Sequence, residues 1–168
     1  MTSLAAKNVH LARYNTLADW ECGSVAAGIN NPEYRRTPGT FQIVTVGATA
    51  GPVTSLGGVQ MTPDVTLAEL NPHDCAMLVL PGAHTWDSGG NQEFVDAARR
   101  WIEAGAPVAG ICGATVCLAQ SGLLDDRAHT SSAPEQLATT GYRGAQHYVD
   151  AAAVTDRNVI TAGAESPV

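Results

Sequence analysis

The stretch Ala106-Pro-Val-Ala-Gly-Ile-Cys-Gly-Ala-Thr115 joins an apolar run to a cysteine and then to small residues. The apolar run predicts a buried β-strand, and the small residues after it begin a helical pattern. A sharp strand-to-helix turn tolerates only small neighbours two residues before its apex and one after it, where Gly110 and Gly113 stand. We therefore expect Cys112 on a nucleophile elbow, with the helix amides favouring its thiolate. The alternative is a small apolar core cysteine.

Strand and helix patterns alternate along the rest of the chain. Because parallel strands need crossover helices, this alternation predicts an α/β fold with a doubly wound, mostly parallel sheet between helices. The predicted strands are residues 7–14, 41–46, 75–80 and 107–111, a hairpin at 52–61, and a final pair at 151–155 and 159–162. The predicted helices are residues 16–27, 91–104, the segment after the elbow and 134–139, with a helical turn at 66–70 and a short extended piece at 129–131.

Composition restricts the classes of protein that the chain can represent. Its 168 residues suit one domain, and nine Lys plus Arg against sixteen Asp plus Glu give a formal charge of −7. No basic stripe is present, so nucleic acid is excluded as an expected partner. No apolar run resembles a signal peptide or a membrane span, and we expect no membrane association and a cytoplasmic location. The four cysteines lack metal-ligand spacing, so we expect them reduced and without bound metal.

Three segments together resemble the ThiJ/PfpI superfamily: the elbow cysteine, Leu80-Pro-Gly-Ala83 and Ala18-Asp-Trp-Glu21. The Gly-Gly-Val hairpin and a late Asp-Arg-Asn-Val-Ile-Thr-Ala segment add to the likeness. The resemblance implies the flavodoxin-like, class I glutamine amidotransferase-like fold over residues 1–168, and a homodimer. Relatives continue into a final helix where this chain stops, so we expect a truncated domain that lacks its C-terminal helix.

The resemblance also implies the roles of individual residues. It places the carboxyl group of Glu21 against the Cys112 sulfur, and the backbone amides of Ala83 and Gly113 form an oxyanion hole. Relatives commonly have a second glycine where this chain has Ala83. The alternatives are an exposed first-turn acid at position 21 and a plain turn after Leu80.

The chain departs from its relatives in its histidines. Protease-like relatives have a histidine directly after the cysteine, where this chain has Gly113, and another common histidine position is occupied by Ser132. The remaining candidates for the pocket are His84, Trp86 and His129. The alternatives are that His129 faces elsewhere and that Trp86 packs its own loop.

These residues predict a cysteine-dependent hydrolase or amidase-like enzyme that acts on a small molecule and needs no metal or organic cofactor. The alternative is a redox or electrophile sensor with an oxidisable cysteine, which the lack of a clear histidine favours. Two further activities known among relatives rank lower. An isonitrile hydratase-like lyase carries a threonine after the cysteine, and a glutamine amidotransferase needs a late His and Glu pair.

Overall fold

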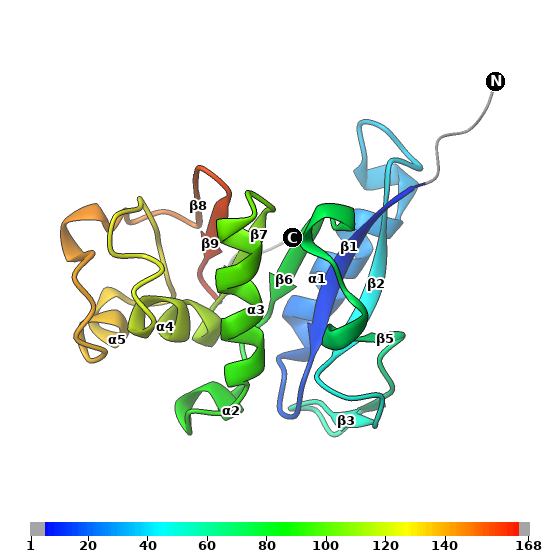
Figure 1. The fold of residues 1–168 in the computed structure, drawn as a ribbon, viewed down its shortest axis with the longest axis horizontal. Coiled ribbons are helices and arrows are strands. Elements are labelled where there is room, and N and C mark those ends of the chain that lie inside the picture. Colours follow the sequence, from blue (N-terminus) through cyan, green and yellow to red (C-terminus); the bar gives the residue numbers. More distant parts are fainter. Residues whose placement is uncertain (1–5, 165–168) are drawn as a thin grey trace.

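The computed structural model describes residues 6–164, which build a seven-stranded sheet in the order β5-β2-β1-β6-β7-β9-β8 (Figure 1). The strands are β1 (Lys7–Arg13), β2 (Phe41–Gly47), β5 (Val65–Thr66), β6 (Met77–Leu80), β7 (Val108–Ile111), β8 (Ala153–Asp156) and β9 (Val159–Ala162). Neighbouring strands pair in parallel, except that β8 runs antiparallel to β9. The mostly parallel sheet predicted from the sequence is confirmed.

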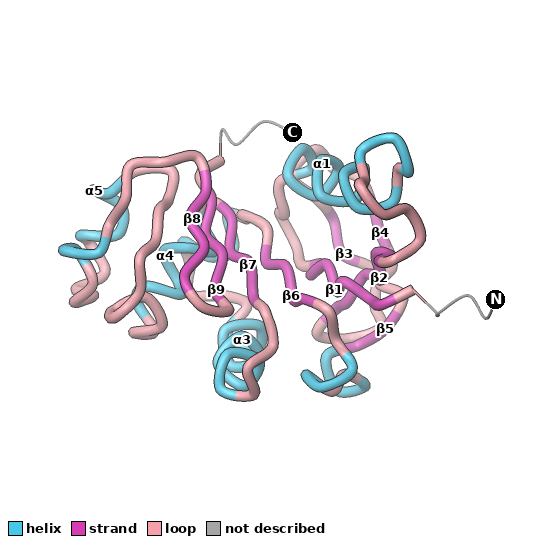
Figure 2. The backbone as a smooth tube through the Cα atoms, turned by 90° about the horizontal axis from the view of Figure 1, so that it is seen from above, coloured by secondary structure: helices cyan, strands magenta, loops and turns pink. Residues whose placement is uncertain are grey.

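Helices cover both faces of this sheet. They are α1 (Asp19–Asn30), α2 (His84–Asp87), α3 (Gln92–Glu103), α4 (Gly113–Gln120) and α5 (Pro134–Ala138). Figure 2 shows α1 on one face and α3 on the other, which is the doubly wound arrangement. The apolar residues of α3 recur at helical spacing, so one stripe that includes Phe94 and Trp101 is buried against the sheet. Gly105, at φ 78°, ends the helix as its position in the sequence predicted.

The elbow strand is packed unusually closely against the helix that follows it. A Cβ atom added to Gly110 would lie 2.6 Å from Cδ1 of Leu118, which is a clash. Leu118 is fully buried and belongs to α4, so the missing side chain lets α4 lie directly on β7. Gly110 therefore fixes the position of the helix that begins beside Cys112.

Several elements differ from the sequence prediction. β3 (Val53–Thr54) and β4 (Gln60–Met61) form the expected hairpin outside the main sheet, but the edge strand β5 and the helix α2 were missed. Both are too short to show a periodic pattern. α1 begins three residues later than predicted because Leu17 pairs with Ala83 in an isolated β-bridge, which holds it extended. The extended piece at 129–131 is reduced to one bridge, from His129 to Tyr148.

The expected absence of a C-terminal helix concerns the end of the chain, and residues 165–168 lie outside the described residues. All four cysteines are free thiols, as predicted. None of the helices formed by residues 6–164 has both the length and the apolar character needed to cross a lipid bilayer.

Candidate functional site

Cys112 occupies a strained turn between β7 and α4, at φ 51° and ψ −122°. Few residues other than glycine adopt such angles, so the surrounding structure must hold them. Its amide donates to the carbonyl of Ala162 at 3.0 Å, and its own carbonyl accepts from the amide and the hydroxyl of Thr115 at 3.0 and 2.6 Å. The predicted strand-to-helix turn is therefore present, with a half-buried cysteine at its apex.

Glu21 reaches the elbow from the first turn of α1. Its side chain points inward, so the residue is only 5% exposed, and the alternative of a solvated acid is excluded. Oε2 accepts the amide of Gly82 at 2.6 Å, whereas Oε1 is buried without a hydrogen-bond partner among the described residues. The Cys112 thiol is close enough to shift the pKa of the Glu21 carboxyl, and that carboxyl shifts the pKa of the thiol in turn.

Gly82 lies where these two side chains meet. An ideal Cβ atom on Gly82 would lie 3.1 Å from Oε1 of Glu21, 3.2 Å from Sγ of Cys112 and 2.9 Å from Cβ of Cys112. Any side chain here would push against both groups. A glycine at this position is therefore a condition for contact between the carboxyl and the sulfur.

The peptide group between Pro81 and Gly82 is hydrogen-bonded at its carbonyl oxygen as well as at its amide. The Pro81 carbonyl accepts both the hydroxyl of Tyr14 and Nε1 of Trp86, the latter at 3.0 Å. Two donors on this oxygen polarise the peptide, so the Gly82 amide becomes a stronger donor to Glu21. Tyr14 and Trp86 thus position the carboxyl without touching the sulfur.

The electrostatics of the sulfur differ from the sequence prediction. Burial, and after it the charge of Glu21, raises the pKa of the Cys112 thiol, although the Ser132 hydroxyl and the Gly113 amide act to lower it. The helix start therefore does not produce a net thiolate-favouring site, because desolvation of the sulfur outweighs it. Burial also raises the pKa of Glu21, so this carboxyl holds its proton to higher pH than an exposed glutamate does.

The Ser132 hydroxyl lies near enough to the sulfur to lower the pKa of the Cys112 thiol. Its Oγ accepts the amide of Ala164 at 2.9 Å, which leaves the hydroxyl proton available for Cys112. His129, a candidate for the pocket, is fully buried elsewhere. Its Nδ1 lies 2.8 Å from the Arg127 carbonyl and its Nε2 lies 3.2 Å from the Tyr142 hydroxyl. The pocket role predicted for His129 is wrong.

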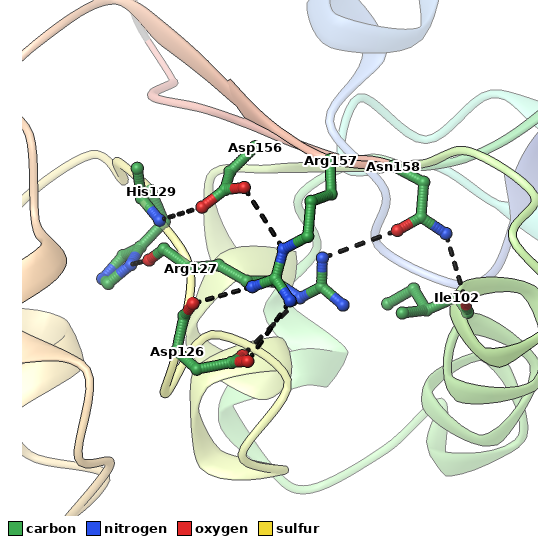
Figure 3. Close-up of polar contacts among 8 residues, drawn as sticks. Ile102, Asp126, Arg127, His129, Asp156, Arg157 and Asn158 are labelled. Atoms are coloured by element: carbon green, nitrogen blue, oxygen red, sulfur yellow. Dashed lines mark hydrogen bonds and ion pairs between the residues drawn. The ribbon is translucent and has the colours of Figure 1, made fainter.

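His129 belongs instead to the region that supports the turn between β8 and β9 (Figure 3). Asp156 accepts the amide of Ala128 at 2.7 Å, and Arg157 donates to the carbonyl of Asp126 at 2.7 Å. Asn158 donates to the carbonyl of Ile102 at 3.0 Å. These contacts join the end of the sheet to the neighbouring loops, so this polar cluster is structural.

A cavity of about 540 Å³ opens over Cys112. Its walls come from α1, the β3–β4 turn, the segment after β6, the start of α4, and α5. They consist of Thr16, Ala18, Trp20, Glu21, Leu56, Gly82, Ala83, His84, Asp87, Cys112, Gly113, Val116, Glu135, Gln136 and Thr139.

The cavity contains most, but not all, of the predicted site residues. His84 lines it as expected, and Ala83 and Gly113 face each other in its wall, where an ideal Cβ on Gly113 would lie 3.7 Å from the Ala83 nitrogen. Trp86 does not line the cavity. It is buried and packs edge-on against Tyr14 with ring centroids 5.1 Å apart, so the alternative reading of a loop-packing residue holds. The indole at the cavity is Trp20, which the sequence analysis missed.

Known proteins are similar to this chain in sequence and in architecture. The model of the DJ-1/PfpI family matches residues 7–167. A Bacillus subtilis protein named uncharacterized protease YoaZ is 32% identical and covers 98% of this chain and 80% of its own length. Deglycase PfpI of Pyrococcus furiosus is 31% identical over 60% of this chain and 61% of its own length.

Solved structures agree with the sequence match. The DJ-1 superfamily protein Atu0886 of Agrobacterium tumefaciens superposes with a TM-score of 0.84 at 34% identity, covering 96% of this chain and 84% of its own. A ThiJ/PfpI family protein of Bacillus anthracis gives a TM-score of 0.85 at 34% identity, covering 96% of this chain and 78% of its own. On the strength of sequence, topology and the elbow cysteine together, the chain belongs to the DJ-1/PfpI family.

Proposed function

We propose that this protein is a cysteine-dependent hydrolase of the amidase type that acts on a small molecule. The observation that supports it best is a buried glutamate held against an elbow cysteine at the floor of an open cavity. A cavity of about 540 Å³ is in the size range of small-molecule sites. The relatives named protease and deglycase are consistent with an enzymatic role.

In the proposed reaction, Glu21 accepts the thiol proton as Sγ of Cys112 attacks the carbonyl carbon of an amide or ester. The negative charge on the substrate oxygen is stabilised by the amides of Ala83 and Gly113. Glu21 then protonates the leaving amine or alcohol, which departs and leaves a thioester on Cys112. Water attacks this thioester while Glu21 takes its proton, and the acid product leaves with the thiol restored.

Glu21 suits this work because its pKa is raised by burial. A general base performs best when its pKa lies near the working pH, and a buried carboxyl is closer to neutrality than an exposed one. Ser132 has a different part in the proposal: its oxygen is already an acceptor for Ala164, so its hydroxyl donates to the sulfur. It stabilises a thiolate but removes no proton.

One observation favours a second candidate, an oxidation sensor. The Gly113 amide and the Ser132 hydroxyl both act on the sulfur, and Glu21 in its protonated form would add a third donor. Such donors suit the oxygens of a sulfinate, which forms when peroxide transfers two oxygen atoms to the thiol in successive steps and is itself reduced to water. A sensor of this kind turns over no substrate.

The first prediction separates these functions. Cys112→Ala should abolish hydrolysis across a panel of small amides, esters and thioesters, and Glu21→Gln should lower kcat/KM by about 10²-fold or more because it removes the base. Cys75→Ala is the matched control, since this half-buried cysteine lies outside the cavity and should leave kcat/KM unchanged.

Activity retained in Cys112→Ala would refute the hydrolase. If the wild-type protein hydrolyses nothing in the panel, but intact-mass analysis after mild peroxide shows two oxygens added at Cys112, the sensor is the function.

The setting of this activity is also proposed. Four free thiols suit a reducing compartment, and we propose the cytoplasm. We propose a homodimer, which light scattering coupled to gel filtration would test.

A further inference from the structure

We infer that the cavity over Cys112 selects small organic cations and rejects anions, so that the substrate carries a positively charged group next to the carbonyl it presents to the sulfur. The statement about a substrate rests on the proposed function. The charge selection itself is a property of the cavity, and it can be measured without any turnover.

Charge of one sign surrounds the sulfur. Glu21, Asp87 and Glu135 line the cavity, and among the described residues in its wall none is lysine or arginine. His84 is the single basic side chain among these described wall residues. An anionic ligand would therefore enter against two exposed carboxylates and meet a third carboxyl beside the thiol.

The two exposed carboxylates come from two different helices. Asp87 ends α2 and Glu135 lies in the first turn of α5, and both helices contact α4, which begins beside Cys112. The charge of Asp87 also reaches the wall behind the cavity. After burial it is the second cause that raises the pKa of Cys117 to about 11. A ligand in the cavity is thus exposed to the negative potential of carboxylates from two helices.

The rest of the wall gives the ligand an apolar body to contact. Trp20 is 55% exposed and Leu56 is 38% exposed, which is unusual for such large apolar side chains. Both line the cavity, together with Val116. An indole face attracts an ammonium group through its π electrons while it excludes water, so Trp20 adds to the selection that the carboxylates begin.

Three methanethiosulfonate reagents of similar reactivity test this inference directly: a trimethylammonium ethyl reagent, a sulfonate ethyl reagent and the neutral methyl reagent. In each, Cys112 attacks the sulfenyl sulfur, a mixed disulfide forms and methanesulfinate leaves. Rates are read from the mass of the peptide that contains Cys112 and are divided by those of a small free thiol. We expect the cationic reagent to exceed the anionic one by about tenfold or more, falling as salt screens the site.

Matched variants locate the effect. Asp87→Asn with Glu135→Gln should reduce the cation-to-anion ratio at least threefold. Glu33→Gln with Asp74→Asn is the control, because it removes the same two charges from exposed positions outside the cavity and should leave the ratio unchanged.

A wild-type ratio near one, or an equal fall in both double variants, overturns the inference. A ratio that behaves as expected in a protein that hydrolyses no ester leaves the inference standing and removes the hydrolase. If hydrolysis is found, nitrophenyl esters with a trimethylammonium group should react with higher kcat/KM than matched esters with a carboxylate, and the reverse order counts against the inference.

Discussion

Gly82 is the residue on which the geometry of the site depends most directly. Its amide holds one oxygen of Glu21, and its missing side chain leaves the space in which the other oxygen faces the sulfur. The same backbone therefore positions the carboxyl and gives it access to Cys112. A conservative change at this glycine tests the contact without altering either reacting group.

We predict that Gly82→Ala lowers both stability and reactivity. The added methyl would lie 2.9 Å from Cβ of Cys112, so the elbow or the carboxyl must move. Overpacking of this kind costs about 1–3 kcal/mol, which thermal unfolding would show as a fall of several degrees. The bimolecular rate of Cys112 alkylation by iodoacetamide should fall as well.

The control for that prediction is Gly23→Ala, in the same helix as Glu21. A Cβ atom there meets nothing within 4 Å, and alanine favours a helix, so stability should hold or rise. Equal behaviour of the two variants would show that position 82 has no special steric role.

Residue-level prediction from sequence worked where backbone chemistry decides the outcome. The elbow at Cys112 follows from its glycines, and Glu21 follows from its place in a known motif. Side-chain direction cannot be read from the sequence: Trp20 and Trp86 both lie in the first turn of a helix, yet Trp20 lines the cavity and Trp86 is buried. The Leu17–Ala83 bridge, invisible in the sequence, settles where α1 begins and hence which way its first turn points.

At the scale of elements, the packing of α4 on β7 determines the position of the turn at Cys112. The two elements are in contact at Gly110 and Leu118. Because Gly110 has no side chain, α4 can begin close to the strand. Any change that lifts α4 also moves the Gly113 amide away from the sulfur. Stability and reactivity should therefore be coupled through this contact.

We predict that Gly110→Ala destabilises the fold by about 1–3 kcal/mol, because its methyl would lie 2.6 Å from Cδ1 of Leu118. Leu118→Ala alone should cost about 2–5 kcal/mol through the cavity it leaves. The double variant should cost less than the sum of the two, since each change makes room for the other. Chemical denaturation of all four proteins measures this cycle, and strict additivity would contradict direct packing.

Element prediction succeeded for the long periodic segments and failed for the short ones. α3 and β6 carry enough apolar residues in sequence to show their type. β5 has two residues and α2 has four, and each exists because a neighbour supplies its hydrogen-bond partners. Tertiary contacts of this kind override local preference, so a single sequence cannot reveal them.

At the scale of the whole molecule, opposing groups set how stability depends on pH. Hydrogen bonds from Thr45 lower the pKa of Asp64, and a bond from the Ala128 amide lowers that of Asp156. Such carboxylates stabilise the fold above their unfolded pKa and lose that contribution as pH falls through the folded pKa. Glu21 acts in reverse, because burial raises its pKa. Its folded form binds the proton more tightly, so stability falls as pH rises from the ordinary glutamate pKa through the raised folded pKa.

We therefore predict that Glu21→Gln stabilises the protein relative to wild type more at pH 7 than at pH 4. Glutamine keeps an acceptor for the Gly82 amide and removes the buried charge that costs stability at neutral pH. Melting temperatures of both proteins at the two pH values decide the point. Glu33→Gln, at an exposed site, is the control and should show no such difference. If the melting temperature of the wild type instead rises relative to that of Glu21→Gln as pH increases, the predicted direction is wrong.

The hydrogen bonds from the elbow to the last strand have a consequence for biosynthesis. The Cys112 amide is tied to Ala162, and Ser132 reaches the sulfur while its oxygen is tied to Ala164. A nascent chain emerges from the ribosome with its amino end first, so the cysteine emerges twenty residues before Ser132 and fifty residues before Ala162. During translation the thiol lacks these partners, and the buried setting that raises its pKa is complete only when the final strand joins the sheet beside it.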